Sequence, residues 1–317
     1  MIPNASWLRR ALAISCCMAA TFLLIAAPAS ANPDCVKLVF QGKLQGRIEH
    51  CGCPKAPLGG LERRAAIMAD IHESCEAVIA IDAGNMLGPI EDGMREQSAF
   101  LGAESARLGT RAVGIGAEDL HFGLEFLREL ESKHGLQFSS ANLRADGEPV
   151  FAPYLIQEAN GLRVGIVSVL APDAELVSEA GDLAGIEIVD PMEALLEVLP
   201  RLREQSDLIV LLSNLEQHGS RELARNLPDG NGVNFMIEGN SASHYGKAVN
   251  IHGIKLLAAN PRGKYLGELT LGVHEGKWNG SFEITEHEVD SRAPGEKAMA
   301  KRVQDFLDSG KMATGSK

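Results

Sequence analysis

The sequence is short of basic residues, and this shortage excludes one class of partner. Its 30 Lys and Arg residues are outnumbered by 42 Asp and Glu residues, which gives a formal net charge of −12. A protein that binds nucleic acid needs a basic surface facing the phosphate backbone, so we expect no nucleic-acid partner. The chain also lacks a Cys-x-x-Cys-His stretch, which argues against covalent haem.

Internal repeats, low-complexity stretches and a clear interdomain linker are missing from the sequence as well. Hydrophobic residues make up 45% of the chain and charged residues 23%, which is typical of a globular protein rather than a disordered chain or a membrane bundle. The 317 residues are enough to bury one large core. We therefore expect one domain over residues 32–290, followed by a C-terminal helix and tail over residues 291–317.

The first 31 residues have the pattern of a signal peptide. Arg9 and Arg10 precede an apolar stretch without acidic residues, and the small residues Ala29, Ser30 and Ala31 follow it. A membrane anchor is the alternative, but the stretch is short and ends in a cleavage pattern. We expect cleavage after Ala31, no stable membrane span in the mature chain, and a periplasmic or secreted protein.

Strands and helices alternate along the mature chain. Apolar runs predict strands at residues 36–40, 77–81, 112–115, 136–141, 207–213, 235–238 and 254–259, hairpins at residues 154–169 and 267–287, and helices at residues 61–71, 96–108, 124–134, 191–205, 220–226 and 296–307. This order predicts a layered α/β (α+β) domain. Ligands of such domains bind at the loops that follow the carboxyl ends of the strands, so we expect functional residues in these loops.

Seven segments, most of them at predicted strand ends, carry a family resemblance. They are residues 38–48 (LVFQGKLQGRI), 59–64 (GGLERR), 81–85 (IDAGN), 116–123 (GAEDLHFG), 140–142 (SAN), 211–215 (LLSNL) and 238–241 (EGNS). In this order they resemble the T-N-D-x-H-G, G-G-x-A-R-R, L-D-A-G-D, G-N-H-E-F-D-Y-G, S-A-N, L-S-H-L and G-G-H-S blocks of the 5′-nucleotidase branch of the calcineurin-like metallophosphoesterases.

The resemblance spans residues 36–273 and implies a fold. That fold is the four-layer αββα sandwich, in which two mixed sheets lie between helices. The separate C-terminal domain that gives the family its nucleotide selectivity is not expected here, because the chain ends soon after the core. Exported proteins that resemble this family also carry a similar Cys-Gly-Cys segment before the G-G-x-x-R-R block.

The family's chemistry depends on residues that this chain replaces. Members hold two divalent metals with Asp, His, Asn and amide groups, and these metals polarise a phosphate while a bridging water attacks it. Here the corresponding positions hold Lys43, Gln45, Asn85, Ala117, Asn214, Asn240 and Ala242, and the positions of the catalytic His–Asp pair hold Glu118 and His121. Amide groups are weak neutral ligands and an ammonium group repels a cation. We therefore assign no metal ligand and expect no cofactor, unless a rearranged site holds a divalent metal.

This cleft has more than one interpretation. Lys43, Gln45, Asn85, Asn214 and Asn240 could bind a small phosphate- or carboxylate-bearing molecule, with Lys43 standing where a metal stood, or an exported protein partner could bind instead. The same side chains could simply fill an abandoned cavity. An active phosphoester or sulfur-ester hydrolase with a rearranged metal site is a further alternative, with Glu118 and His121 as its catalytic residues.

Four cysteines remain after removal of the signal peptide, namely Cys35, Cys51, Cys53 and Cys75. An even number in an exported protein suggests disulfides. The preferred interpretation is structural: Cys51 and Cys53 pair with Cys35 and Cys75 and fix the long loop to its neighbours.

Two other interpretations of the Cys-Gly-Cys segment stay open. The pair Cys51 and Cys53, beside Arg47 and His50, could act as a redox dithiol, because a disulfide across one residue is strained and easily reduced. Alternatively, Cys51, Cys53 and His50 could hold a metal through thiolates, although Cys-x-Cys is tighter than the usual zinc spacing.

Overall fold

Alternating hydrophobic residues explain why β1 (Cys35–Gln41) lies inside a sheet with both faces covered. Val36, Leu38 and Phe40 point to one face and Val39 to the other, and all four are buried. The computed structural model describes residues 35–53, 57–241 and 247–311. The predicted signal peptide lies outside these residues. In the part that is described, no helix combines the length and apolarity needed to cross a bilayer.

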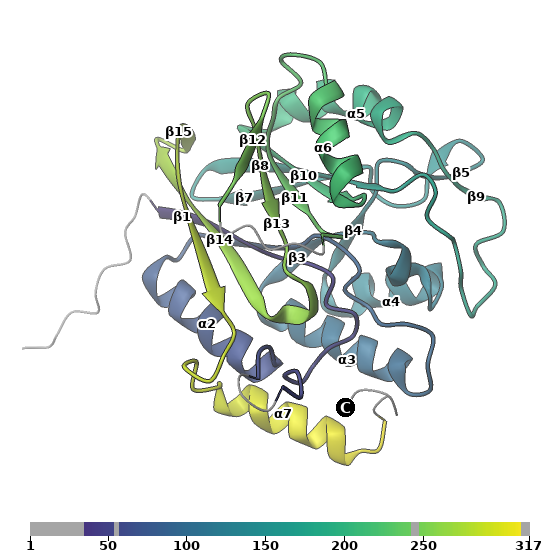
Figure 1. Cartoon of the computed structure of the whole chain (residues 1–317), viewed down its shortest axis with the longest axis vertical. Helices are drawn as coiled ribbons and strands as arrows, with labels where there is room; N and C mark the ends of the chain where they lie inside the picture. The colour runs from purple at the N-terminus through teal and green to yellow at the C-terminus, as the bar shows by residue number, and fades with distance from the viewer. Residues whose placement is uncertain (1–34, 54–56, 242–246, 312–317) are drawn as a thin grey trace, which may run out of the picture. The chain divides into compact units, whose positions relative to one another are not determined.

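β1 belongs to a six-stranded sheet with the order β15-β14-β1-β2-β3-β4 (Figure 1). β1 runs parallel to β2 (Val78–Asp82), β3 (Thr110–Gly114) and β4 (Gln137–Ser139). β14 (Tyr265–His274) and β15 (Lys277–Glu288) complete the sheet in the antiparallel direction. The parallel strands bring their carboxyl ends to one edge, where several of the family blocks begin.

The second large sheet has the order β12-β13-β11-β10-β8-β7. Four strands are parallel, β8 (Leu162–Leu170), β10 (Leu208–Asn214), β11 (Val233–Glu238) and β13 (Ile254–Ala258), whereas β7 (Tyr154–Ala159) and β12 (Val249–Ile251) are antiparallel to their neighbours. The predicted turn between β7 and β8 is confirmed, with Asn160 and Gly161 both at positive φ. A small sheet joins β5 (Leu143–Ala145), β6 (Glu148–Pro149) and β9 (Ile186–Ile188).

Helices cover the outer faces of the two large sheets. α2 (Leu61–Ser74), α3 (Met94–Arg107) and α4 (Leu124–His134) lie beside the first sheet, and α5 (Pro191–Gln205) and α6 (Gln217–Asn226) lie beside the second (Figure 1). α7 (Lys297–Asp308) packs against α2 and α3. Between the sheets, Leu38 and Ile81 share one buried cluster with Val210 and Phe235. The predicted four-layer αββα sandwich with two mixed sheets is confirmed.

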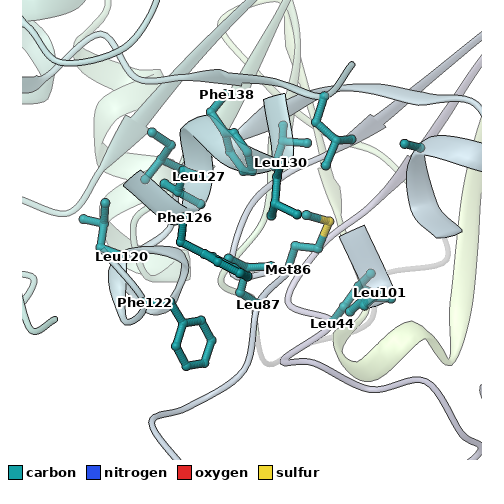
Figure 2. Close-up of a cluster of buried hydrophobic side chains, with 14 of the residues drawn as sticks. Leu44, Met86, Leu87, Leu101, Leu120, Phe122, Phe126, Leu127, Leu130 and Phe138 are labelled. Atoms are coloured by element: carbon teal, nitrogen blue, oxygen red, sulfur yellow. The ribbon is translucent and has the colours of Figure 1, made fainter. Parts of the chain in front are cut away.

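A buried cluster supports the loops at the carboxyl edge of the first sheet (Figure 2). Leu44, Met86, Leu87, Leu120 and Phe122 all belong to it and are almost fully buried. These residues alternate in sequence with the polar residues of the predicted cleft. The cluster therefore anchors each loop from behind and holds its polar side chains on the opposite side.

Candidate functional site

The structure brings the predicted cleft residues together at the junction of the two sheets. Lys43 and Gln45 follow β1, and Asn85 follows β2. Glu118 lies on the short helix η1 (Ala117–Leu120) after β3, with His121 directly behind it. From the second sheet, Asn214 ends β10 and Asn240 follows β11 by two residues. Ala242, the last of the predicted positions, lies outside the described residues.

Three side-chain hydrogen bonds of the predicted residues join the sheets across this cleft. Lys43 Nζ donates a hydrogen bond to Asn240 Oδ1 at 2.7 Å, and Asn85 Nδ2 donates to Asn214 Oδ1 at 3.3 Å. Asn214 Nδ2 in turn donates to the carbonyl of Ala83 at 2.5 Å. The positions that match family metal ligands thus use their polar atoms to bind one another or the neighbouring backbone.

The rest of the cleft continues the same network. Gln45 Nε2 donates to both carboxylate oxygens of Glu118, at 2.9 and 3.1 Å. Asn85 Oδ1 accepts from the Glu118 amide at 3.0 Å, so Asn85 links the two halves of the network. His121 Nδ1 lies 3.2 Å from the carbonyl oxygen of Gly88, a contact in which the ring nitrogen donates. Hydrogen bonds therefore fix each of these polar cleft residues within one small region.

The backbone of the cleft is unusual as well. Lys43, Gln45, Asn85 and Arg262 all have φ between 51° and 62°, the left-handed region that non-glycine residues rarely adopt. Backbone bonds hold this conformation, because Lys43 N donates to Gly84 O (2.7 Å), Gln45 N donates to Asn85 O (3.0 Å) and Arg262 N donates to Lys43 O (2.8 Å). Such conformations persist where the surrounding structure enforces them.

The Asp119 side chain fixes the backbone around the cleft through hydrogen bonds. Its carboxylate accepts hydrogen bonds from three backbone amides, those of Asn85 (2.7 Å), Leu87 (2.9 Å) and Gly116 (2.9 Å). Burial raises the pKa of Asp119 to about 7, in spite of these donors. Asp119 is the positioning group of the site, since it joins the loop after β2 to η1.

A pocket of about 220 Å³ opens beside the network. Gln45, Glu118 and His121 line it, as predicted cleft residues, together with Arg47, Glu91 and Arg262, which sequence reasoning did not place there. Arg262 also donates to Gln45 Oε1 at 3.5 Å. The only sequence signal for Arg262 was the Asn260-Pro261 turn before it, and the path of the connection from β13 to β14, which brings it to the pocket, is not visible in the sequence.

A larger cavity of about 450 Å³ lies elsewhere, between the start of α5 and α6. His218 and Glu222 line it, and the side chain of His218 is 89% exposed. None of the predicted site residues contributes to this cavity. We assign the candidate site to the smaller pocket, because residues of two family blocks line it, Gln45 and Arg47 from the first and Glu118 and His121 from the block at residues 116–123.

The donor set of the cleft does not fit two divalent metals. The metal positions present an ammonium group and four side-chain amides, whose oxygens on Asn85, Asn214 and Asn240 are already occupied by N–H donors. Glu118 is the one anionic side chain among the predicted residues. Across the described residues there is also no group of three or more His, Cys, Asp or Glu side chains arranged to hold a metal ion. A dinuclear site needs several anionic ligands to offset four positive charges.

The preferred pairing of the cysteines is wrong. Cys35 pairs with Cys75, with 5.9 Å between their Cα atoms, and Cys51 and Cys53 are in no disulfide. The topology explains the pairing, because β1 begins at Cys35 and Cys75 ends the helix that returns the chain to β2, the parallel neighbour of β1. The disulfide therefore closes the first β-α-β unit rather than fixing the loop. It indicates an oxidising compartment.

Comparison with known proteins agrees with this geometry, although no family model matches the sequence. A 5′-nucleotidase of Vibrio cholerae serotype O1 is 25% identical over 191 residues, which cover 55% of this chain and 34% of that protein. The chain thus spans about a third of the length of this curated relative.

Solved structures show the fold. The Thermus thermophilus sulfate thiohydrolase SoxB in complex with glycerol superposes with a TM-score of 0.73 at 16% identity, over 86% of this chain and 60% of that one. A 5′-nucleotidase precursor from Thermus thermophilus gives 0.72 at 22% identity, over 87% and 59%. The calcineurin-like phosphoesterase YfkN from Bacillus subtilis gives 0.67 at 16% identity, over 87% and 98%. The chain therefore has the calcineurin-like phosphoesterase fold, and its resemblance to the 5′-nucleotidase branch of that superfamily is confirmed.

Proposed function

We propose that this chain is an exported relative of the 5′-nucleotidases that binds a small anionic molecule in its cleft and does not hydrolyse nucleotides. The replaced metal positions support the second half of this proposal. An ammonium group and mutually bonded amides offer no place for the two cations that would polarise a phosphate.

The binding of a small molecule in the cleft is supported above all by a cluster of residues with left-handed backbone conformation. Eight non-glycine residues of the described chain have positive φ, and four of them, Asp146, Asn160, His252 and Glu275, precede a glycine in a turn between adjacent strands. The other four, Lys43, Gln45, Asn85 and Arg262, meet at the cleft. Each such residue costs about 1 kcal/mol or more. An abandoned cavity would have no reason to keep this strain, whereas a binding site would.

The charge of the pocket supports an anionic ligand. Arg47 and Arg262 line it, and Glu91 and Glu118 are the acidic side chains among its lining residues. Lys43 precedes the lining residue Gln45 by two positions, and its ammonium group bonds Asn240. Guanidinium groups bind phosphate and carboxylate through paired hydrogen bonds. The two carboxylates favour a ligand that also carries a hydroxyl, amide or amino group, because such a group can donate to them.

Two features together support the proposed export. The Cys35–Cys75 disulfide indicates an oxidising compartment, and the N-terminal segment has the pattern of a signal peptide. The periplasm or the cell exterior satisfies both.

Calorimetric titration tests the binding proposal. The mature protein is titrated with orthophosphate, adenosine monophosphate and succinate, and we expect at least one of them to bind. Lys43→Ala and Arg262→Ala should each weaken the affinity for that ligand by roughly 10- to 100-fold, since a hydrogen bond to a charged group contributes about 1.5–3 kcal/mol. The matched control is Arg225→Ala, on the exposed surface of α6. Absence of binding by all three anions, or unchanged affinity in the two cleft variants, contradicts the proposal.

Elemental analysis and turnover assays test the other half. We expect no transition metal to copurify with untagged mature protein, and no cleavage of a generic phosphomonoester or phosphodiester after addition of manganese, zinc or cobalt. Two equivalents of bound metal accompanied by turnover would instead establish the alternative, a hydrolase with a rearranged metal site.

A further inference from the structure

The Cys-Gly-Cys segment is not part of the anion pocket, yet it has its own local architecture. Cys51 lies in the loop between β1 and α2, and its amide donates to Leu58 O at 2.8 Å. Leu58 N returns a hydrogen bond to Cys51 Sγ at 3.2 Å, and an antiparallel bridge joins His50 to Gly59. This reciprocal pairing fixes Cys51, while Cys53 is exposed to solvent.

The surroundings of the two sulfurs make them unequal. Burial alone would raise the pKa of Cys51, but the amides of Leu58 and Cys53, the thiol of Cys53 and the charge of Lys264 outweigh it and lower this pKa to about 7. The pKa of Cys53 is raised, first of all because its thiol donates a hydrogen bond to Cys51. Near pH 7 a large part of Cys51 is therefore thiolate, whereas Cys53 keeps its proton. The thiolate is the reactive form of cysteine.

The second pair of cysteines shows the contrast. Cys35 is 8% exposed and Cys75 is fully buried, and both are already joined in a disulfide. A reagent in solution reaches Cys53 and not the buried pair. The chain thus separates a structural disulfide from an accessible dithiol within the short stretch from Cys35 to Cys75.

A metal site is the competing use of two adjacent thiols. Zinc sites need four ligands, and three of them normally come from the protein even in open sites. Within the described ranges, no third His, Cys, Asp or Glu side chain joins Cys51 and Cys53 in a metal-binding arrangement. Lys264, which carries a positive charge, acts on both sulfurs instead. These surroundings favour a reaction of the thiolate over the binding of a cation.

We propose that Cys51 and Cys53 form a reversible dithiol–disulfide site that exchanges with an accessible disulfide of another molecule. The Cys51 thiolate attacks one sulfur of that disulfide, whose S–S bond breaks and releases the first thiolate. Cys53 then loses its proton to the released thiolate and attacks Cys51 Sγ, which forms the Cys51–Cys53 bond and releases the second thiolate. The chain's dithiol is oxidised by two electrons, and the partner disulfide is reduced to one thiol and one thiolate, which takes up a proton from water according to its own pKa.

The spacing of the two cysteines makes the proposed exchange reversible, because the oxidised pair is easily reduced again. A disulfide that spans a single residue is strained, and strain raises the reduction potential. Gly52 between the two cysteines leaves room for closure, because no atom of the described residues other than its two chain neighbours lies within 4 Å of the position that its Cβ would occupy.

Reaction of the reduced mature protein with oxidised glutathione, followed by alkylation and mass spectrometry, tests the proposal. We expect loss of two hydrogen atoms at Cys51 and Cys53, full reversal by reduced glutathione, and no change at Cys35–Cys75. Cys53→Ser should accumulate a mixed disulfide of Cys51 with glutathione, because no second thiol resolves it. Cys51→Ser should react at least tenfold more slowly than Cys53→Ser at pH 7, since the remaining thiol is protonated.

Three results would overturn the proposal: two stable mixed disulfides on the wild-type protein, equal reactivity of the two single variants, or stoichiometric zinc that protects both thiols from alkylation. A second arm uses insulin in place of oxidised glutathione. Faster reaction with insulin identifies a protein disulfide as the partner, and faster reaction with glutathione identifies a small molecule.

Discussion

Gly239 is the residue on which the junction of the two sheets depends most directly. A Cβ atom at this position would lie 2.3 Å from the carbonyl oxygen of Ala83, an atom of the backbone that cannot rotate away. Gly239 follows β11, and Ala83 follows β2, so the contact joins the two sheets directly beside Asn240 and Asn85. Any side chain here separates the halves of the cleft.

We expect Gly239→Ala to lower the free energy of unfolding by about 1–3 kcal/mol, the usual cost of overpacking. Urea unfolding followed by circular dichroism measures it. Gly52→Ala is the matched control: apart from its two chain neighbours, no described residue has an atom within 4 Å of its Cβ position, and a change within about 0.5 kcal/mol is expected. Equal stability of the two variants would show that the sheets are free to separate at this point.

The sequence predicted which residues meet at the cleft, and it did not predict how they bind one another. Each family block is local, so Lys43, Asn85 and Asn240 could be placed at strand ends one by one. The bond from Lys43 to Asn240 joins residues 197 positions apart, and its existence depends on the angle between two sheets. Arg262 escaped prediction for the same reason, since only the packing of the β13–β14 connection brings it beside Gln45.

At the level of elements, the ends of helices could be predicted where the sequence contains clear capping residues. α4 and α5 begin and end at the predicted residues, because Gly123 and Gly135 flank the former and the Asp190 carboxylate accepts from the first amides of the latter. β5, β6, β9 and β12 were not predicted, since none is longer than three residues and none is long enough to show a periodic pattern. The cysteine pairing was also missed, because sequence spacing alone cannot select one connectivity among several.

α7 is the element whose packing is most easily tested. Met299 and Val303 enter the buried cluster beside α3, Phe306 stacks on Phe100 with 4.5 Å between ring centroids, and Arg302 Nε binds Glu104 Oε2 at 2.9 Å. The exposed face of the same helix carries the Lys301–Asp305 pair. α7 is thus a part of the domain core and not a loose extension.

Met299→Ala should therefore lower the free energy of unfolding by about 2–4 kcal/mol, because it deletes a fully buried side chain and leaves a cavity. Lys301→Ala, two residues further along the helix, should change it by less than about 1 kcal/mol, as expected for an exposed ion pair. Thermal and urea unfolding of both variants give the comparison. A small effect of Met299→Ala would mean that the rest of the domain is stable without α7.

For the molecule as a whole, two buried carboxyl groups link stability to pH. Asp82 ends β2 and Asp119 lies on η1, and neither side chain is exposed. Burial raises the pKa of Asp82 to about 7, although the amide of Gly84 and the charge of Arg64 oppose it, and burial raises the pKa of Asp119 to about 7 as well. Glu268 shows the opposite shift. Burial alone would raise its pKa, but hydrogen bonds from His287, Lys37 and Thr270 outweigh burial and lower the pKa to about 2.

These shifts have opposite signs and define a stability maximum. Between about pH 4 and pH 7 the folded protein keeps protons on Asp82 and Asp119 that the unfolded chain has released, so stability falls as pH rises through this window. The contribution of Glu268 is complete above about pH 4.5 and is lost as pH falls toward 2. The contribution of these three groups to the free energy of unfolding should therefore be greatest near pH 4.

We expect the unfolding free energy to fall by at least about 2 kcal/mol between pH 5 and pH 8, since one pKa unit corresponds to about 1.4 kcal/mol. Asp82→Asn removes one of the two titrating groups, so its profile over the same range should be flatter than that of the wild type. The exposed control Asp229→Asn should keep the wild-type slope. Urea unfolding at four pH values measures all three proteins. A wild-type profile that is flat or rises toward pH 8 would place both carboxyl groups in the ionised state, and the amide donors around them would then outweigh burial.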